Sequence, residues 1–529
     1  MKYLIKISIP LFLLLFPLTA GAQGNQETNK LVNKLGQTLF FLNNYYLDTL
    51  NNNELVDAAI ISMLSELDPH SSYVNARDVK AMNEPLEGNF EGVGIEYAII
   101  RDTLTVSAPI AGGPCERAGV RAGDKIVAVD SENIASVNLT NERVQKYLRG
   151  AKGTRVRLDI IRKGEKKILT FDIIRDKIPI NSLDACYEVN PGVIYMKLSR
   201  FAATSAREII NALVDLNIKK INGVILDLRG NSGGYLGTAL EIANFFLEGD
   251  QVIVYTEGMR VPKMTEKANG NGFYKKGPLA VLIDENSASA SEIVAGAIQD
   301  WDRGVIIGRR SFGKGLVQQM LPLNDGSQLR LTVARYHTPS GRVIQMPYKN
   351  GNSKDYYKEH LERYSRGEYF SKDSISLPDS LKFKTLIEKR TVFGGGGIMP
   401  DIFVPADTTN YSDYFSVLIR KNILLDFMNS LSDARRAEWQ KSYPDYKTFL
   451  NNFVVEEKMF QDLFSYAQEK GLPADIPGAE RSKSIIALNM KALVARTLFG
   501  MAGYYRVINS QDDEAFGKAL LYVSSKAGV

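Results

Sequence analysis

In the segment VILDLRGNSGG, residues 224–234, a short apolar run passes directly into a polar turn rich in glycine, which is the clearest indication of the fold. Two further apolar runs of buried-strand length follow, at residues 280–283 and 305–307. Amphipathic helical patterns come after the first two runs, at residues 236–246 and 289–299. Strands that alternate with helices in this way predict an α/β core.

The composition of the chain changes on both sides of this core. Before the core, leucines recur at helical spacing. Between that helical segment and the core, the sequence predicts short strands separated by glycines. No internal repeat is evident. We expect a signal peptide at residues 1–22, an N-terminal helical domain at 23–80, a β-rich domain at 86–179, an α/β core at 180–405 with a polar excursion at 346–392, and a C-terminal helical region of unknown role at 406–529.

The N-terminus has the pattern of a secretory signal. Lys2 and Lys6 precede an apolar run at residues 7–18, and Ala20-Gly21-Ala22 offers a small-residue cleavage site. The run is short for a membrane span, and we find no later run of spanning length. The sequence therefore predicts an exported protein, periplasmic or extracellular, with no stable membrane span. An uncleaved N-terminal anchor is the alternative.

The composition excludes several classes of function. Lys and Arg number 65 against 60 Asp and Glu, a net charge of +5 without a long basic run, so nucleic acid is not an expected partner. Only two cysteines, Cys115 and Cys186, are present, which is too few for thiolate-rich zinc sites or iron–sulfur clusters. We expect no metal and no cofactor. Whether the two cysteines pair is left open.

A run of small residues, NSASASE at residues 286–292, stands where a strand ends and a helix begins. A serine there would be uncrowded, and the helix N-terminus favours nearby negative charge, which suits a nucleophile that attacks a carbonyl. Ser287, Ser289 and Ser291 are rival candidates. Ser289 with Glu292 also forms a capping-box pattern, which needs no catalytic role.

The stretch GRRSFGKGLVQ, residues 308–318, nearly matches a phosphate-binding loop and raises a nucleotide hydrolase as an alternative. The match fails at Gly315, where a hydroxyl would be needed to hold Mg²⁺. Lys314 is instead a candidate general base, if desolvation lowers its pKa toward neutrality. An ordinary surface lysine is the simpler interpretation of Lys314 alone.

The three histidines fit a Ser–His–Asp triad poorly. His70 lies in an Asp-Pro-His turn far from the core in sequence, and His360 lies in the charged excursion, where we expect it to be solvated. His337 follows a strand and is the one plausible candidate, although a structural role suits it better.

Taken in order, these stretches resemble the C-terminal processing (tail-specific) proteases. The matching segments are DLRGNSGG at residues 227–234, SASASEI at 287–293, FGKGLVQ at 312–318, TPSGR at 338–342, GGGGIMPD at 394–401 and LDPHSSY at 67–73. They span about residues 64–405. The helical remainder beyond Asp407 matches no motif.

The resemblance implies a crotonase-like α/β core that carries a Ser–Lys dyad. It assigns Ser289 as the nucleophile, Lys314 as the general base and Gln318 as a support for that lysine. Residues four apart in an extended strand lie roughly 13 Å from each other. Contact between Lys314 and Gln318 therefore predicts a helical turn over residues 314–318.

The same resemblance implies an oxyanion hole built from backbone N–H groups. They would be those of Ala290 and of one glycine, Gly233 or Gly234. Asp300, near the end of the nucleophile helix, resembles a position that supports the site, with a surface helix cap as the simpler alternative.

The β-rich segment resembles a PDZ domain, with Gly92, Val93, Gly94 and Ile95 as its carboxylate-binding loop. Such a loop presents N–H groups to a terminal carboxylate while the tail adds as an extra strand. The sequence thus predicts a serine endopeptidase that acts on proteins and peptides with accessible C-termini. A non-catalytic PDZ adaptor is the alternative. The natural substrate, a homo-oligomer and an activating adaptor are left open.

Overall fold

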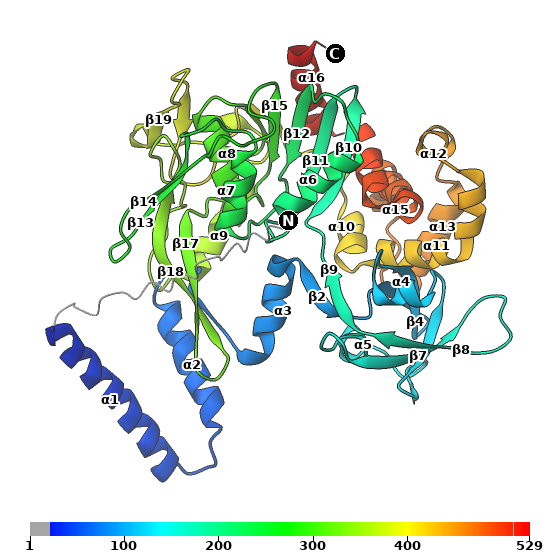
Figure 1. Ribbon diagram of the computed structural model, residues 1–529, viewed down its shortest axis with the longest axis horizontal. Coiled ribbons are helices and arrows are strands. Elements are labelled where there is room, and N and C mark those ends of the chain that lie inside the picture. Colours follow the sequence, from blue (N-terminus) through cyan, green and yellow to red (C-terminus); the bar gives the residue numbers. More distant parts are fainter. Residues whose placement is uncertain (1–21, 512, 529) are drawn as a thin grey trace, which may run out of the picture. The chain divides into compact units, whose positions relative to one another are not determined.

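A computed structural model describes residues 22–511 and 513–528 (Figure 1). The signal pattern at residues 1–22 lies outside the described residues, apart from Ala22. The chain divides into two compact units, residues 1–63 and 64–529. In the first, α1 (Ala22–Tyr45) is followed by most of α2 (Asn52–Ser65), the two helices expected before the β-rich domain.

The core of the second unit is a six-stranded sheet in the order β10-β11-β12-β15-β16-β21. The β10–β11 pair is antiparallel and the other pairs are parallel. The strands are β10 (Leu183–Asn190), β11 (Val193–Leu198), β12 (Gly223–Asp227), β15 (Leu279–Ile283), β16 (Val305–Gly308) and β21 (Ile402–Phe403). The apolar runs that the sequence marks as buried strands are β12, β15 and β16, so the α/β expectation is confirmed.

Helices cover both faces of this sheet, as its two-sided apolar strands require. One face packs against α6 (Ser205–Asp215), α7 (Leu236–Asn244) and α8 (Ala290–Asp300). The opposite face packs against α16 (Glu514–Ala527), labelled in Figure 1. Phe516 and Ala519 of this helix are buried against Ile225 and Ala280. The end of the helical region is therefore one layer of the α/β core.

A second sheet flanks α8 and carries the segment that follows Lys314. Its strands are β1 (Ser72–Val74), β13 (Val252–Glu257), β14 (Met264–Lys267), β17 (Leu316–Pro322) and β18 (Gln328–His337). The polar excursion then supplies α9 (Ser353–Ser365), the 3₁₀ turns Lys372–Ser374 and Asp379–Leu381, β19 (Lys382–Lys384) and β20 (Thr391–Phe393).

The β-rich domain is a sheet in the order β3-β4-β5-β7-β8. Its elements are β3 (Ile95–Ile100), β4 (Thr103–Pro109), α4 (Pro114–Ala118), β5 (Lys125–Val129), β6 (Glu132–Asn133), α5 (Asn141–Leu148), β7 (Arg155–Ile161) and β8 (Leu169–Ile174). The helix α3 (Ala76–Glu87) leads into it. Strands β2 (Asn89–Gly92) and β9 (Asp176–Pro179) pair with each other, so the chain enters and leaves the domain at one place.

The C-terminal helical region has its own apolar core. It comprises α10 (Asp413–Arg420), α11 (Ile423–Ser442), α12 (Tyr446–Asn452), α13 (Glu457–Glu469), α14 (Ile476–Arg481), α15 (Lys483–Ser510) and α16. By length and composition α15 could cross a membrane, so the expectation of no later run of spanning length is wrong. Its apolar residues include Ile486 and Met490, which are buried in the core of this region.

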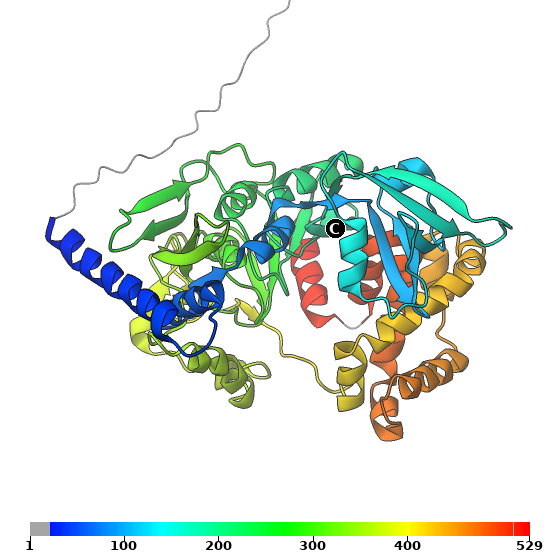
Figure 2. The ribbon, with the colours of Figure 1, turned by 90° about the horizontal axis from the view of Figure 1, so that it is seen from below.

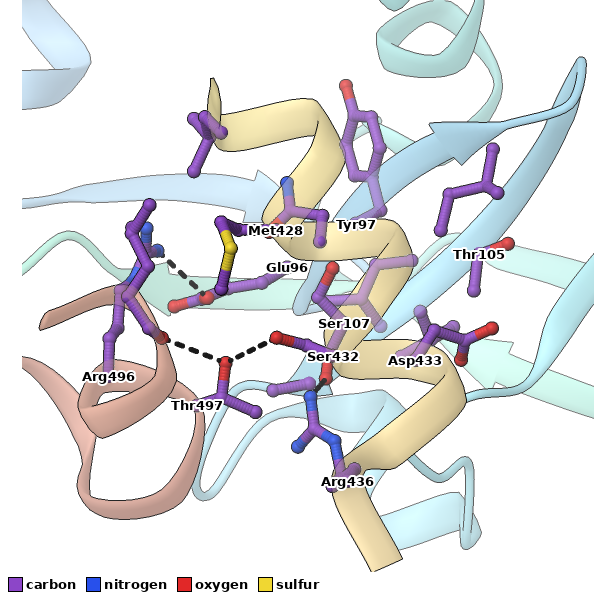
Figure 3. Close-up of a pocket in the computed structure, with 17 residues that line it drawn as sticks. Glu96, Tyr97, Thr105, Ser107, Met428, Ser432, Asp433, Arg436, Arg496 and Thr497 are labelled. Carbon is purple, nitrogen blue, oxygen red and sulfur yellow. Dashed lines mark hydrogen bonds and ion pairs between the residues drawn. The ribbon is translucent and has the colours of Figure 1, made fainter. Parts of the chain in front are cut away.

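The helical region lies beside the β-rich domain (Figure 2), with α11 against β3. Figure 3 shows the boundary, a cavity of about 360 Å³ between β3, β4, α11 and α15. Arg436 Nη2 donates to the Ser107 carbonyl at 2.9 Å, and Arg496 forms an ion pair with Glu96 at 3.4 Å. The β3–β4 register shifts between Glu96 and Tyr97, which leaves Ser107 without a partner residue on β3.

Candidate active site

A cavity of about 450 Å³ brings together the segments that the sequence marks for chemistry. It lies between the glycine turn after β12, the N-terminus of α8, the segment that enters β17, the strand β18 and the helix α3. Ser289, Ala290, Lys314, Gln318, Gly233 and Gly234 all border it.

Of the three rival serines, Ser289 is the one that borders this cavity. Ser287 and Ser291 are fully buried, and their hydroxyls donate to the carbonyls of Leu228 and Asn231, at 2.9 and 2.8 Å. Ser289 precedes α8 with φ 54° and ψ −112°, a strained backbone conformation for a residue with a side chain. Such strain occurs at nucleophiles that stand on a strand-to-helix turn.

Lys314 has the surroundings of a neutral amine. Burial, together with the nearby charge of Arg330, lowers its pKa from 10.5 to about 8. Its Nζ donates to Gln318 Oε1 at 2.8 Å, and Gln318 Nε2 donates in turn to the carbonyl of His70. Ser289 Oγ and Lys314 Nζ border the same cavity without a hydrogen bond between them.

The helical turn expected between Lys314 and Gln318 is wrong. The chain enters the extended strand β17 at Leu316, yet the Lys314 and Gln318 side chains meet. The estimate for a straight strand does not apply, because Lys314 and Gly315 precede the strand and the β17–β18 register shifts between Val317 and Gln318. The bulge turns Gln318 toward the lysine.

Glu292 joins the nucleophile to the base-bearing segment. Its carboxylate is fully buried and accepts from Ser289 N at 2.8 Å, Gly313 N at 2.7 Å, Lys314 N at 2.9 Å and Ser311 Oγ. Burial raises the pKa of Glu292 to about 7, against the lowering effect of these donors. The sequence pattern indicates only the capping contact with Ser289, because the other donors come from a segment beyond β16.

The two glycines of the turn have different roles. The Gly233 N–H donates to Asn231 Oδ1 at 2.9 Å, so it is not free for an oxyanion. A Cβ on Gly233 would lie 2.8 Å from Ser289 Cβ, which explains why glycine is needed there. Within residues 22–511 and 513–528, the N–H groups of Gly234 and Ala290 have no hydrogen-bond acceptor.

The carboxylate of Asp227 stabilises the start of this turn, where it accepts a hydrogen bond from Arg229 N at 2.9 Å. Burial alone would raise its pKa, but the charges of Arg229 and Lys197 hold the pKa well below its usual range. Arg229 also forms an ion pair at 2.8 Å with Asp513, the N-cap of α16. The glycine turn is thus connected to the helix that covers the far face of the sheet, which no local pattern indicates.

Asp300 does not border the cavity. It is fully buried and forms an ion pair with Arg342 at 2.7 Å, while its Oδ2 accepts from Ser340 N at 2.9 Å. A surface helix cap is therefore the wrong description. The pair connects the end of α8 to the turn after β18.

The histidines have other partners. His337 stacks on Tyr255 and lies 3.1 Å from Glu257, a structural role. His360 stacks on Phe312 with ring centroids 4.0 Å apart, and burial lowers its pKa to about 4, so the expectation that it is solvated is wrong. His70 Nε2 lies 3.1 Å from the Tyr356 hydroxyl, and the carbonyl of His70 receives Gln318, a contribution that sequence reasoning missed.

The resemblance of residues 308–318 to a phosphate-binding loop does not extend to their structure. The N–H groups of Gly313 and Lys314 donate to Glu292 and would not be available to a phosphate. A strand follows Lys314, whereas a phosphate-binding loop opens a helix.

The candidate carboxylate-binding loop lies between β2 and β3. Gly94 takes φ +78°, and a Cβ there would press on Ile178 and Pro114. In the described chain the Gly94 N–H has no hydrogen-bond acceptor, and β3 pairs with β4 alone, so its outer edge is open. Cys115 is buried in this domain, and both it and Cys186 are free thiols.

The chain matches known families over three segments. The profile of Peptidase family S41 covers residues 192–355, that of the PDZ domain covers 105–162, and a family of unknown function covers 414–500. The carboxy-terminal processing protease CtpB of Bacillus subtilis is 34% identical over 367 residues, which are 69% of this chain and 74% of that protein.

A second relative and a solved structure are also similar to this chain. A carboxy-terminal-processing protease of Bartonella bacilliformis is 38% identical over 60% of this chain and 74% of its own length. A solved structure of a photosystem II D1 C-terminal processing protease is 26% identical, covers 71% of this chain and 87% of that chain, and has a TM-score of 0.37. From these sequence matches, the chain belongs to peptidase family S41, as a serine-type carboxy-terminal processing protease that carries a PDZ domain.

Proposed function

We propose that this protein is an exported endopeptidase that binds free C-terminal tails through its PDZ domain and hydrolyses peptide bonds with the dyad Ser289 and Lys314. We assign its central sheet, with helices on both faces, to the crotonase-like class. Export rests on the signal pattern at residues 1–22.

The first step is acyl transfer to Ser289. Neutral Lys314 accepts the proton of the Ser289 hydroxyl as the oxygen attacks the substrate carbonyl, and returns that proton to the leaving amine. Water then attacks the acyl-enzyme. Lys314 accepts a proton from this water and returns it to Ser289 Oγ as the acyl group is released. Gln318 positions the lysine, because its amide is held between Lys314 Nζ and the carbonyl of His70.

The negative oxygen of the tetrahedral intermediate is stabilised by the N–H groups of Ala290 and Gly234. Both belong to the turns around Ser289 and lack other acceptors in the described chain. Gly233 donates no hydrogen bond to this oxygen; its lack of a side chain allows the turn to lie close to Ser289. Preorganised donors of this kind are worth about 3 kcal/mol each in the transition state.

Tail recognition is assigned to the loop formed by Gly92, Val93, Gly94 and Ile95. The Gly94 N–H is available to a terminal carboxylate, and the open edge of β3 can pair with an extended tail. An internal peptide segment has no carboxylate to accept from this loop, so free C-termini are preferred.

One observation carries the proposal. Ser289, the one serine of its run that borders the cavity, shares that cavity with a lysine whose pKa burial lowers to about 8. A PDZ adaptor without catalysis would need neither the strained serine nor a desolvated lysine. That adaptor remains the second candidate because the open β3 edge would serve it equally.

The test compares the unmodified protein with Ser289→Ala and Lys314→Ala on an unfolded protein that ends in an apolar tail. We expect cleavage by the unmodified protein alone, and tail binding by all three. Lys276→Ala removes an exposed lysine and is the control, since it should cleave normally. Equal cleavage by all variants would refute the dyad, and binding without cleavage by every protein would favour the adaptor.

A further inference from the structure

The side chains that line the active-site cavity include basic groups and no acidic one among the described residues. Arg200, Lys314 and Arg330 border it, and the described lining residues include no aspartate or glutamate. Arg200 makes one long contact, from Nη1 to the Asn181 carbonyl at 3.4 Å. The guanidinium of Arg330 makes no hydrogen bond or ion pair with any described residue, although its backbone pairs within the sheet.

Arg330 belongs to the strand β18 and lines the cavity. It lies on β18 opposite Met320 of β17, which also borders the cavity, and opposite Ser72 of β1 on the other side. Burial lowers the pKa of Arg330, and no neighbouring carboxylate offsets this effect. A half-buried guanidinium without an acid is costly, whereas the same group is well suited to hold a planar anion through two parallel hydrogen bonds.

We propose that Arg330 forms a carboxylate-binding subsite for the part of the substrate on the C-terminal side of the scissile bond. This inference rests on the proposed Ser289–Lys314 mechanism. The base returns its proton to the leaving amine, so the C-terminal fragment departs on the side of Lys314. Arg330 lies on β18, which pairs with the strand that follows Lys314, and both residues line the cavity, which places Arg330 on the same side.

Two carboxylates of a substrate have the chemistry to reach this guanidinium. One is the side chain of an aspartate or glutamate just after the scissile bond, and the other is the terminal carboxylate of a short C-terminal fragment. Both accept two hydrogen bonds from one arginine. Neutral analogues, glutamine and a C-terminal amide, keep the shape but lose the charge.

The experiment is a double-mutant cycle in which one change is made in the enzyme, at Arg330, and the other in the peptide substrate. The cleavage site of a peptide with an apolar tail is mapped by mass spectrometry, and Glu or Gln is then placed after the scissile bond. A second pair of peptides ends in a free acid or an amide. The unmodified protein, Arg330→Gln and Arg330→Lys are compared by kcat/KM on all four peptides.

We expect the unmodified protein to favour one charged peptide over its neutral analogue about tenfold. Arg330→Gln should abolish that preference and Arg330→Lys should retain part of it. The peptide pair that responds identifies which carboxylate is bound. The PDZ loop contributes equally in every enzyme, so its preference for a free acid cancels from the cycle. Arg335→Gln removes an exposed charge from the same strand and should change nothing.

The outcomes separate the two proposals. If the unmodified protein cleaves none of the peptides, the proposed function fails and the subsite fails with it. If it cleaves all four but shows no charge preference, or if Arg330→Gln keeps the preference, the subsite is wrong while the protease stands. If Arg330→Gln does not fold, Arg330→Lys supplies the enzyme comparison, and the Glu and Gln peptides, which end in the same tail, still test the charge preference in the unmodified protein.

Discussion

Lys314 Nζ lies 2.8 Å from Gln318 Oε1 although the chain becomes an extended strand between the two residues. The contact is made possible because Lys314 precedes the strand and a bulge lies at Gln318. Because the far end of the Gln318 amide donates to the His70 carbonyl, the lysine is oriented through a turn that precedes α3. The position of the proposed base therefore depends on three separate segments of the chain.

Removing this amide should impair catalysis more than binding. We expect Gln318→Ala to lower kcat about tenfold with little change in KM, because the lysine loses its one charge-assisted hydrogen bond and its orientation. Steady-state kinetics on an unfolded substrate measure both constants. Gln319→Ala alters the exposed neighbour and is the matched control. A Gln318→Ala enzyme with an unchanged kcat would show that the contact does not position the base.

The pH dependence of cleavage should report the pKa of Lys314. The base acts in its neutral form, and burial lowers its pKa to about 8, so kcat/KM should rise about tenfold per pH unit up to that value and level off above it. Arg330→Gln removes a nearby positive charge and should move this limb to higher pH. A limb near about 7 that Lys314 variants do not change would instead indicate Glu292, whose pKa burial raises to about 7.

Glu292 offers a sharp test because every contact of its carboxylate is with a donor. In Glu292→Gln an amide N–H₂ would face N–H groups, leaving buried donors unsatisfied at a cost of about 1–3 kcal/mol each. We expect a lower melting temperature and slower labelling of Ser289 by a fluorophosphonate probe. Glu241→Gln, on the exposed side of α7, should change neither. An unaltered labelling rate in Glu292→Gln would mean that the carboxylate does not hold the nucleophile.

The contact between Arg436 and the Ser107 carbonyl should restrain the PDZ domain. We expect Arg436→Ala to raise amide hydrogen exchange in β3 and β4 about fivefold, since one hydrogen bond at the boundary is lost. Arg435→Ala removes the adjacent arginine, which pairs with Glu438 on the surface, and serves as control. The restraint would be disproved if both variants exchanged alike.

Much of the core was predictable because its signals are local. The apolar runs at residues 224–226, 280–283 and 305–307 are buried strands, and the helix expected at residues 289–299 is α8. Hydrophobic periodicity and strand length depend on neighbours along the chain, so they can be read without a fold. The burial of His360 was missed, since its stacking partner Phe312 lies in another segment.

The α/β order of the core and the small-residue helix start at Ser289 follow from local sequence, because backbone conformation and periodicity are properties of consecutive residues. The folded chain was needed to show that Ser289 and not Ser287 borders the cavity, that Lys314 is desolvated, and that the Gly233 N–H already donates a hydrogen bond. The folded chain also shows that no carboxylate of the described residues forms an ion pair with the Arg330 guanidinium. The burial of a group and its hydrogen-bond partners are set where segments distant in sequence come together. The pKa of the group, and whether it is free to bind a substrate, depend on both.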